Sequence, residues 1–353
     1  MFIRLGFNII SLINFMILCR LKFLLYSPIL YTIGTIIAEI ENNHDLNVYN
    51  YFIGIIFILN THIMTHLYNE FYDIDSDRIN KNPSPWTGGS RVLALNLLPI
   101  KVSLIAGHIT LMISIILVCM MTNFSSIYLS LLIVFLAHGY SSPPLRLETR
   151  GLGEFTVMLV LNIMVPLLGF TQQAGDLITN KLFLILIPLA IIEFVRMMIM
   201  NIPDIEPDAM TNKRTLVVRI GPKKTAIFYS VGIILSYILL LLMYFFDFPL
   251  LIIFLLLSTS PLGLWIAYRL IRGDWKSTSQ LWNLPFWAST HNGFVAALAL
   301  LGLIWHFNQK KFFDIESLPL WIYFIVFIFL QINNSKYLYY KNNISSTGEG
   351  KIN

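Results

Sequence analysis

The chain has 353 residues, of which 56% are hydrophobic and only 12% are charged, and its mean hydropathy is +0.71. A soluble globular domain carries roughly a quarter charged residues, so these values exclude that class and favour a helical membrane protein. The formal net charge of +5 does not indicate nucleic-acid binding, because the basic residues follow the membrane topology described below.

Ten apolar runs are long enough to cross the hydrocarbon core of a bilayer as helices. They cover residues 23–41, 50–72, 100–121, 125–142, 154–172, 181–200, 224–246, 249–271, 285–306 and 318–334. We therefore expect an all-α polytopic membrane protein. Residues 1–22 contain a shorter apolar stretch flanked by Arg4, Arg20 and Lys22, with no small-residue cleavage site after it. We interpret these residues as an uncleaved helix at the membrane interface.

The basic residues predict the orientation of these runs. With the amino terminus in the cytoplasm, the cytoplasmic side collects 20 of the 24 Lys and Arg residues. Lys181, Lys310 and Lys311 fall on the other side, and Arg196 lies within a run. Such a bias follows the positive-inside rule and predicts a multi-pass protein of the cytoplasmic membrane.

The second and the sixth apolar runs end in matching acidic segments. Residues 69–77 read NEFYDIDSD, and residues 201–208 read NIPDIEPD. Both runs are even-numbered, so both segments emerge at the same, cytoplasmic face of the membrane. The sequence therefore predicts two acidic clusters that face one site.

The spacing of the acidic residues is typical of one face of a helix. Asn69, Asp73 and Asp77 are each four residues apart, so their side chains project from the same side. Asp204 and Asp208 repeat this spacing, although the prolines at 203 and 207 bend or unwind the chain there.

Two carboxylate clusters at one site repel each other unless a positive charge lies between them. A solvated helix end would explain one such cluster but not two matching ones. A calcium-binding EF-hand is excluded because Arg78 stands where its turn glycine belongs and Ser84 where its bidentate Glu belongs. Hard oxygen ligands from separate segments favour Mg²⁺, which commonly bridges carboxylates to the phosphates of a substrate.

Basic side chains in the same cytoplasmic loops indicate which anion the site binds. Lys and Arg are the residues that hold diphosphate oxygens once the metal ions are in place. The group consists of Lys81, Arg91, Arg146, Arg150, Lys213 and Arg214.

These motifs resemble the UbiA superfamily of intramembrane prenyltransferases. The stretch NEFYDIDSD is similar to the family's Asn-x-x-x-Asp-x-x-x-Asp signature, and DIEPD to its second Asp-x-x-x-Asp motif. YSSPPLRLETRGLGE (140–154) and NKRTLVVRIG (212–221) also agree with the family. SPWTGGSRVL (84–93) resembles the branch that prenylates 1,4-dihydroxy-2-naphthoate in menaquinone biosynthesis. The resemblance spans roughly residues 20–306.

The resemblance implies a bundle of about nine transmembrane helices, here residues 23–306. Residues 1–22 would precede it as the interfacial helix. Residues 307–353 would add a further C-terminal span and a polar tail, which we expect to lie outside the active site. Glu70 stands where many family members carry Asp, a change that keeps an acid and so leaves the metal chemistry unaffected.

The implied reaction is transfer of a prenyl group from an allylic diphosphate to an aromatic acceptor inside the membrane. An allylic diphosphate ionises once the charge on its leaving group is neutralised. We expect two Mg²⁺ ions, with Asn69, Asp73 and Asp77 as ligands of one and Asp204 and Asp208 as ligands of the other. The six basic residues named above would hold the diphosphate.

The remaining roles concern the allyl cation and its capture. Tyr140 opens the 140–154 stretch and is our candidate for a ring that stabilises the cation. Asp75 or Glu206 would take the proton of the acceptor. The favoured acceptor is 1,4-dihydroxy-2-naphthoate, an electron-rich ring that attacks without strong base catalysis.

Polar residues inside the apolar runs are further candidates. His62 and His66 share a helix face with Asn69 and are interpreted as acceptor contacts, buried hydrogen-bonding groups or, less favourably, zinc ligands. Glu193 and Arg196 lie one turn apart and are expected to neutralise each other beside the site. His291 and Asn292 also fall within a run and are candidates for substrate contact.

Two other functions remain open at this point. One keeps the fold and the ionisation step but uses another acceptor, such as 4-hydroxybenzoate, homogentisate or a lipid hydroxyl, or cyclises the substrate itself. The other is a cation-coupled transporter, which would place its carboxylates near the bilayer midplane rather than at one face.

Overall fold

The computed structural model describes residues 9–42, 45–81, 83–84, 86–175, 180–277, 283–307 and 314–346. Within these ranges the chain forms helices and loops, and no strand is assigned. Four basic residues used in the topology prediction, Arg4, Lys310, Lys311 and Lys351, lie outside the described ranges.

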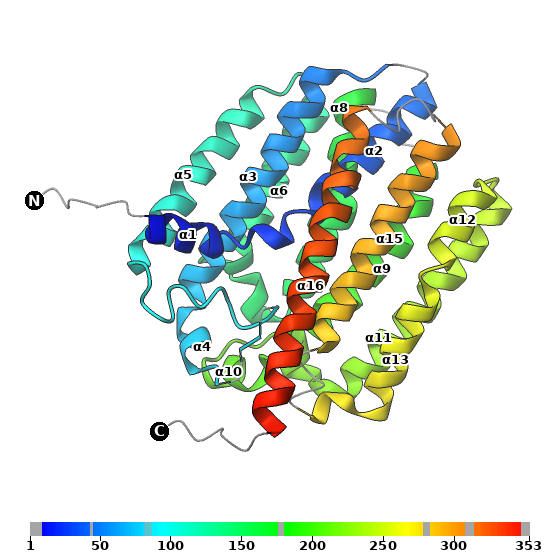
Figure 1. Cartoon of the computed structure of the whole chain (residues 1–353). Helices are drawn as coiled ribbons and strands as arrows, with labels where there is room; N and C mark the ends of the chain where they lie inside the picture. The colour runs from blue at the N-terminus through cyan, green and yellow to red at the C-terminus, as the bar shows by residue number, and fades with distance from the viewer. Residues whose placement is uncertain are drawn as a thin grey trace, which may run out of the picture.

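Most of the chain lies in long helices that run side by side as one bundle (Figure 1). They are α2 (Tyr26–Asn42), α3 (Val48–Tyr72), α5 (Ile100–Cys119), α6 (Phe124–Ser141), α9 (Asn180–Met200), α11 (Leu216–Leu242), α15 (Asn283–Phe307) and α16 (Leu318–Ser346). Two further crossings are made from shorter pieces: α7 (Gly153–Met158), η3 (Leu159–Met164) and α8 (Val165–Ala174) form one, and α12 (Leu250–Leu257) and α13 (Ser260–Arg272) form the other.

The remaining pieces are short helices. They are α1 (Ile9–Leu18), η1 (Leu21–Phe23), α4 (Ile74–Ile79), η2 (Leu147–Arg150), α10 (Ile205–Met210), η4 (Met243–Phe246), η5 (Asp274–Lys276) and η7 (Ile315–Ser317). Of these, α1 lies across the flank of the bundle, at a steep angle to α3 (Figure 1).

Nine segments within the described ranges are long and apolar enough to cross a membrane. A tenth results if α2 is counted together with α1 and η1, because α2 alone has only 17 residues and the two parts are bent by 45°. The predicted all-α polytopic membrane fold is therefore confirmed, and the runs predicted from the sequence correspond to these segments in order.

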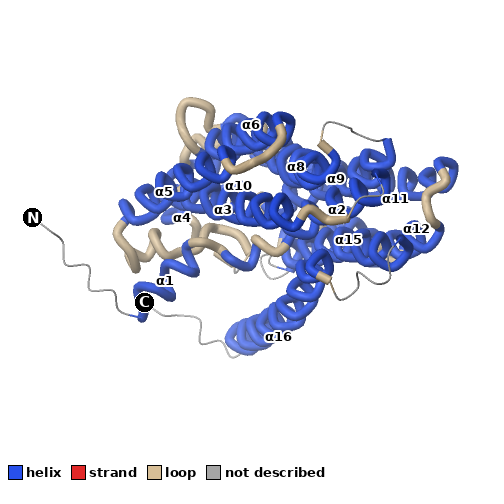
Figure 2. The backbone as a smooth tube through the Cα atoms, turned by 90° about the horizontal axis from the view of Figure 1, so that it is seen from above, coloured by secondary structure: helices blue, strands red, loops and turns tan. Residues whose placement is uncertain are grey.

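Large apolar side chains cover the outside of the bundle as well as its core. Phe124, Met112 and Phe254, for example, are all more than 60% exposed. A surface of this kind suits hydrocarbon rather than water. Seen from above, α16 lies on the outside of the bundle (Figure 2).

Two glycines allow α2 and α8 to pack closely. A Cβ atom on Gly34 would overlap the backbone carbonyl of Pro166, and one on Gly169 would overlap the carbonyl of Tyr31. Small residues at such crossings let two membrane helices approach each other through their backbones. This contact fixes α2 against the crossing that contains η3.

The crossing α7–η3–α8 is interrupted by one stretch of π-helix, η3. A π-helical turn contains an extra residue, so it rotates the side chains that follow relative to their directions in a regular α-helix. Here the amide of Asn162 in η3 donates a hydrogen bond of 2.8 Å to the Tyr26 hydroxyl on α2.

Both acidic segments leave their long helices at the same end of the bundle. Helix α3 ends at Tyr72 and a separate short helix, α4, follows; likewise α9 ends at Met200 before α10. The predicted break near the prolines at 203 and 207 is confirmed. The break at Asp73, where the backbone has φ −94° and ψ 2°, has no proline to mark it.

Candidate active site

The two acidic segments contact each other directly. The Ser76 hydroxyl on α4 donates a hydrogen bond of 2.7 Å to Asp208 on α10. The Asn80 amide, just after α4, donates one of 2.9 Å to Asp204. Segments about 130 residues apart in the chain therefore form one cluster, as their shared membrane face predicts.

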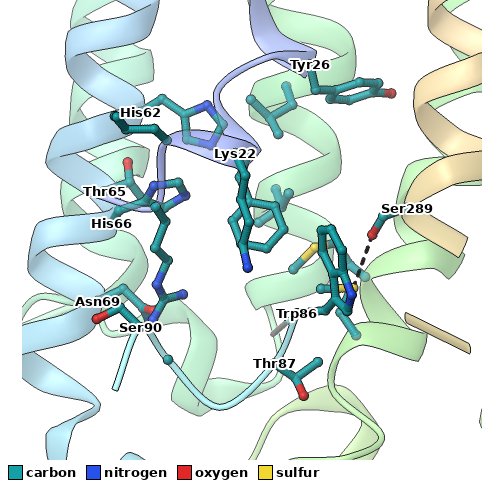
Figure 3. Close-up of a pocket in the computed structure, with 18 of the residues that line it drawn as sticks. Lys22, Tyr26, His62, Thr65, His66, Asn69, Trp86, Thr87, Ser90 and Ser289 are labelled. Carbon is teal, nitrogen blue, oxygen red and sulfur yellow. Dashed lines mark hydrogen bonds between the residues drawn. The ribbon is translucent and has the colours of Figure 1, made fainter. Parts of the chain in front are cut away.

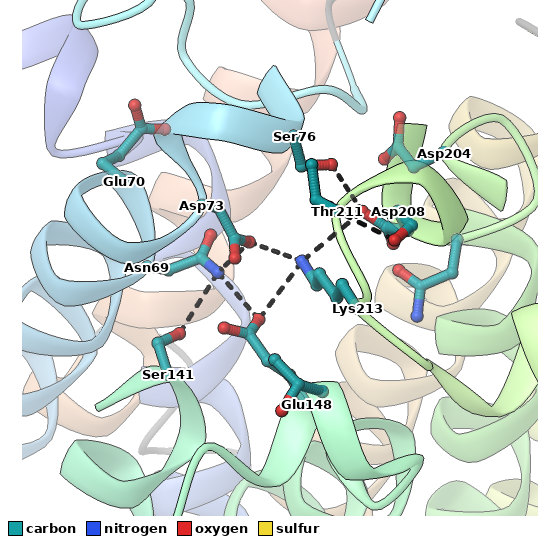
Figure 4. A network of polar contacts seen from close by, with 12 residues as sticks. Asn69, Glu70, Asp73, Ser76, Ser141, Glu148, Asp204, Asp208, Thr211 and Lys213 are labelled. Carbon is teal, nitrogen blue, oxygen red and sulfur yellow. Dashed lines mark hydrogen bonds and ion pairs between the residues drawn. The ribbon is translucent and has the colours of Figure 1, made fainter. Parts of the chain in front are cut away.

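Lys213 lies in the middle of this cluster (Figure 4). Its Nζ atom is 2.5 Å from Asp73, 3.4 Å from Glu148 and 3.8 Å from Asp208. The Asn69 amide donates hydrogen bonds to the same Asp73 oxygen at 2.7 Å and to Glu148 at 2.9 Å. A lysine from the loop after α10 thus supplies the positive charge that the opposed carboxylates require.

The loop of residues 86–91 closes one side of the cluster. The Gly88 backbone N–H donates to Asp204 at 3.2 Å, and the Arg91 guanidinium donates to the backbone carbonyl of Asp77. Gly89 has a φ of 73° and lies so close to the Asp77 carboxylate that a Cβ atom would overlap it. Only glycine combines that backbone conformation with so close an approach.

Glu70 fixes the same loop from the other side. Its carboxylate accepts hydrogen bonds of 2.6 Å from both the backbone N–H and the hydroxyl of Ser90, and it forms an ion pair with Arg20. The side chain points away from Asp73 (Figure 4). The Glu70 carboxylate therefore links the loop of residues 86–91 to Arg20 in the N-terminal segment.

Burial raises the pKa of several carboxyl groups in the cluster. The pKa of Asp77 is raised to about 8, that of Glu148 to about 8 and that of Asp204 to about 7. Removal from water is the largest cause in each case, and neighbouring carboxylates add to it. For Lys213, burial lowers the pKa, but Asp73, Glu148 and Asp208 outweigh it and hold the pKa well above its usual value.

The chemistry of the cluster fits divalent metal ions. Its carboxylate and amide oxygens are hard ligands of the kind Mg²⁺ prefers. Oε1 of Glu148 is buried without a hydrogen-bond partner. Within the described ranges no three acidic, His or Cys side chains are arranged to hold a metal as they stand. The ammonium group of Lys213 occupies the space between Asp73, Glu148 and Asp208 instead.

A cavity of about 1050 Å³ extends from this cluster into the bundle (Figure 3). Its charged end includes Asp73, Asp77, Asp204, Asp208 and Lys213. Further from that end, α1, α6, η3, α9 and α16 contribute mainly apolar and aromatic side chains, whereas α3 and α15 contribute mostly polar ones. The volume suits a drug-sized or larger ligand with an anionic head and an apolar body.

A sequence model of the UbiA prenyltransferase family matches residues 29–291, about three quarters of the chain. The chain belongs to the UbiA prenyltransferase family. The match contains both acidic segments, Lys213 and the loop 86–91, so the family resemblance noted from these motifs is confirmed. No curated protein sequence matches the chain significantly.

Solved UbiA-type structures share the fold at low sequence identity. A UbiA homolog from Aeropyrum pernix K1 superposes with a TM-score of 0.61 at 15% identity, covering 80% of this chain and 97% of that one. A homolog from Archaeoglobus fulgidus bound to GPP and Mg²⁺ gives 0.56 at 14%, covering 81% and 99%. A digeranylgeranylglyceryl phosphate synthase gives 0.58 at 17%, covering 83% and 99%.

The six basic residues predicted to hold diphosphate are not all in the same place. Arg91 and Lys213 line the cavity. The other four, Lys81, Arg146, Arg150 and Arg214, are not among its lining residues. Lys81, Arg150 and Arg214 are exposed, and the Arg150 guanidinium donates to the carbonyl of Pro144 at 2.8 Å.

The predicted metal ligands and Tyr140 do come together in this UbiA-type site. Asn69, Asp73 and Asp77 from α3 and α4 line the cavity with Asp204 and Asp208 from the α10 segment, and Tyr140 lines it from α6. Asp75 and Glu206, the candidate bases, are exposed and do not line it.

The polar residues inside the spans have identifiable partners. Nδ1 of His62 lies 3.1 Å from the Ser27 hydroxyl, and Nδ1 of His66 lies 2.9 Å from the carbonyl of Cys19. The two imidazole rings are 4.7 Å apart and both line the cavity. These contacts favour the hydrogen-bonding interpretation over a zinc site.

The predicted mutual neutralisation of Glu193 and Arg196 is confirmed by their ion pair. The Asn292 amide adds a hydrogen bond of 2.7 Å to Glu193, and Arg196 and Asn292 both line the cavity. His291 turns to the Tyr237 hydroxyl, 2.7 Å away, and is not a lining residue.

Among the cavity-lining residues that were not predicted from the sequence are Arg20, Lys22, Trp86 and Glu148. In the sequence, Arg20 and Lys22 flank the predicted interfacial helix, and Glu148 belongs to the 140–154 stretch. The signal for Glu148 was present, because it is the one acid between two arginines in a loop on the charged face.

The expectation that the last span lies outside the active site is wrong. Tyr323, Phe327 and Leu330 of α16 line the cavity. Helix α16 packs against α2 and α15 and so forms part of the cavity wall.

Proposed function

We propose that the protein transfers a prenyl group from an allylic prenyl diphosphate to an aromatic acceptor within the membrane. The observation that supports this proposal most strongly is that both acidic segments contact Lys213 at the charged end of a largely apolar cavity. A diphosphate head fits the charged end once metal ions are bound, and a hydrocarbon chain fits the apolar walls.

We further propose that the charged end binds Mg²⁺. The Archaeoglobus fulgidus homologs solved with GPP and Mg²⁺ and with DMAPP and Mg²⁺ support this proposal. The residues that would hold the metal are Asn69, Asp73 and Asp77 from one segment and Asp204 and Asp208 from the other. Bound there, Mg²⁺ would neutralise charge on the departing diphosphate.

The side chains of the protein itself assist this departure. Lys213 is fully charged at neutral pH, because three carboxylates surround it. With metal ions bound to these carboxylates, the ammonium group of Lys213 would be available to the diphosphate oxygens. Arg91 extends from the loop that closes the site. Tyr140 lines the cavity beside this end and presents a ring to the allyl cation.

The favoured acceptor is 1,4-dihydroxy-2-naphthoate, an aromatic acid. Trp86, within the 84–93 stretch that resembles the naphthoate branch, lines the cavity opposite α3 (Figure 3). The ammonium group of Lys22 lies 4.7 Å from the centre of the Trp86 ring and 5.0 Å from that of Phe23. Aromatic faces next to a cation suit a flat ring that bears a carboxylate.

The exposed bases of the charged face have a different proposed role. Lys81, Arg150 and Arg214 lie at the same end as the cluster and would attract anionic substrates from solution. We propose that this end faces the cytoplasm and that the site opens there, as the distribution of basic residues supports. Residues 23–306 would form the catalytic bundle, preceded by the interfacial segment 1–22.

The test is an assay of the purified protein with several allylic diphosphates and a panel of aromatic acceptors, with products identified by mass. We expect a prenylated 1,4-dihydroxynaphthalene, which air oxidises to the naphthoquinone during isolation, release of one CO₂ for each prenyl group transferred, and complete loss of activity in EDTA. A product with another phenol but none with the naphthoate would refute the acceptor. Full activity without metal would refute the mechanism.

Lys22→Met adds a specific test of the acceptor. The variant should lose the preference for the naphthoate over 1,4-dihydroxynaphthalene, which lacks the carboxylate, while the KM for the diphosphate stays the same. Lys101→Met is the matched control, because Lys101 is exposed at the start of α5 and does not line the cavity. A rise in the KM for the diphosphate instead would place Lys22 at the leaving group.

A further inference from the structure

Helix α16 begins well beyond the part of the chain that matches the family, which ends at residue 291. It nevertheless supplies Tyr323, Phe327 and Leu330 to the cavity that starts at the acidic cluster. The spacing of three and four residues places these side chains on one face of the helix. An element outside the family's matched region thus forms a wall of the site.

The opposite face of α16 has a different environment. Ile325 and Phe329 are 69% and 62% exposed, whereas Tyr323 is 7% exposed. In a membrane the exposed face contacts lipid. The helix therefore separates the inside of the cavity from the surrounding hydrocarbon.

The aromatic side chains on the cavity side are held in fixed positions. Tyr323 packs against Gly293 of α15, where any Cβ atom would overlap its ring and hydroxyl. The rings of Tyr323 and Phe327 stack with centres 6.0 Å apart, and Phe327 meets Phe294 edge to face at 4.6 Å. Rings anchored in this way present a rigid surface to whatever occupies the cavity.

The chemistry of this wall selects its ligand. Among the lining residues of α9 and α15 the charged one is Arg196, which is paired with Glu193. Helix α16 lines the cavity with two aromatic side chains, Tyr323 and Phe327, and one aliphatic side chain, Leu330. Contact with a hydrocarbon is what such a surface can stabilise.

We propose that α16 determines which prenyl chain the enzyme accepts, with Tyr323 and Phe327 contacting the hydrocarbon of the allylic diphosphate and limiting its length. This inference rests on the proposed prenyl transfer and deepens it. The diphosphate is held at the charged end, so each added isoprene unit extends further along the cavity. The two rings then meet the distal part of the chain, and substitutions there act on specificity rather than on the chemical step.

The test compares kcat/KM for geranyl and geranylgeranyl diphosphate in wild type and in Phe327→Ala. The variant should raise the ratio of the longer to the shorter substrate by about tenfold or more, the scale on which a hydrophobic pocket discriminates a methylene group or two. Phe329→Ala is the matched control, because it makes the same substitution on the lipid-facing side of the same helix. Phe327→Leu, which keeps most of the packing, should shift the ratio in the same direction if the alanine variant does not fold.

An unchanged ratio in both Phe327 variants would overturn the proposal, as would an equal shift in Phe329→Ala. Crosslinking gives a readout that needs no turnover. A prenyl diphosphate with a diazirine at the distal end of its chain should label the peptide that contains Tyr323 and Phe327. Labelling without transfer would refute the proposed function but support the role of α16, and labelling confined to other helices would refute the role of α16.

Discussion

Replacing Lys213 by methionine should destabilise the metal-free protein mainly by leaving its carboxylates unpaired. The Lys213 side chain is 14% exposed, and its ammonium group contacts Asp73, Glu148 and Asp208. Without it, one more carboxyl group has to be protonated in the folded state. For an Asp with an unfolded-state pKa of about 3.9, protonation costs about 4 kcal/mol at pH 7 but only about 1.5 kcal/mol at pH 5.

The sign of the pH effect follows from this difference. The unfolded chain keeps that carboxylate ionised at pH 7, so the variant loses more stability at pH 7 than at pH 5. The cost at pH 7 agrees with the roughly 3–5 kcal/mol expected when one partner of a buried ion pair is removed. Adding Mg²⁺ should reduce the difference, because the metal replaces the missing positive charge.

The assay is unfolding of wild type and Lys213→Met in detergent micelles with EDTA, at pH 7 and at pH 5. The loss of stability at pH 5 should be about a third of the loss at pH 7. Lys101→Met should show no loss at either pH. An equal loss at both pH values would mean that Lys213 stabilises the fold through packing and not through its charge, and the reasoning would be refuted.

Three further results are expected. Asp208→Asn should abolish Mg²⁺-dependent turnover while the protein still folds, whereas Glu206→Gln, on the same short helix but exposed, should retain activity; equal losses would remove Asp208 from the metal site. The apparent affinity for Mg²⁺ should be at least about tenfold weaker at pH 6 than at pH 8, because burial raises the pKa of Asp204 to about 7 and that of Asp77 to about 8, and the metal must displace their protons; titration of Mg²⁺ binding measures this, and a flat profile would contradict it. In a Cys119→Ser background, a cysteine at 206 should be protected from an impermeant thiol reagent in intact cells and one at 181 should react; the reverse pattern would invert the proposed orientation.

Much of the fold could be predicted because lipid imposes simple requirements on the chain. Each crossing needs a long apolar helix, and such runs can be recognised one at a time. The meeting of Asp208 with Ser76 was predictable for a related reason. Both acidic segments follow even-numbered spans, so the parity of the crossings alone places them at one face.

The partners within the site depend on contacts that no local pattern contains. Lys213 was one of six basic candidates, and only the packing of the α10–α11 loop against α3 brings it between the carboxylates. The ion pair of Arg20 with Glu70 joins residues 50 apart in the chain. Lys22 could not be recognised as a site residue, because basic residues that flank an apolar stretch are already expected at a membrane interface.

The role of α16 was missed for a different physical reason. An amphipathic helix reveals its two faces through polarity, but α16 carries apolar and aromatic side chains on both faces. Phe327, which faces the cavity, and Phe329, which faces outward, are the same residue type in opposite environments. Only the three-dimensional structure distinguishes them.

The apolar flank beside α1 has a consequence for how products leave. Ile13, Met16 and Ile17 line the cavity and are also about half exposed on the outer surface, so the cavity reaches the lipid there. Under the proposed chemistry the two products have opposite solubilities. Inorganic diphosphate can depart to water past the loop 86–91, while the prenylated ring can pass sideways into the bilayer. The diphosphate then does not have to enter lipid, and the prenylated ring does not have to enter water. Turnover should therefore depend on the lipid or detergent that takes up the apolar product.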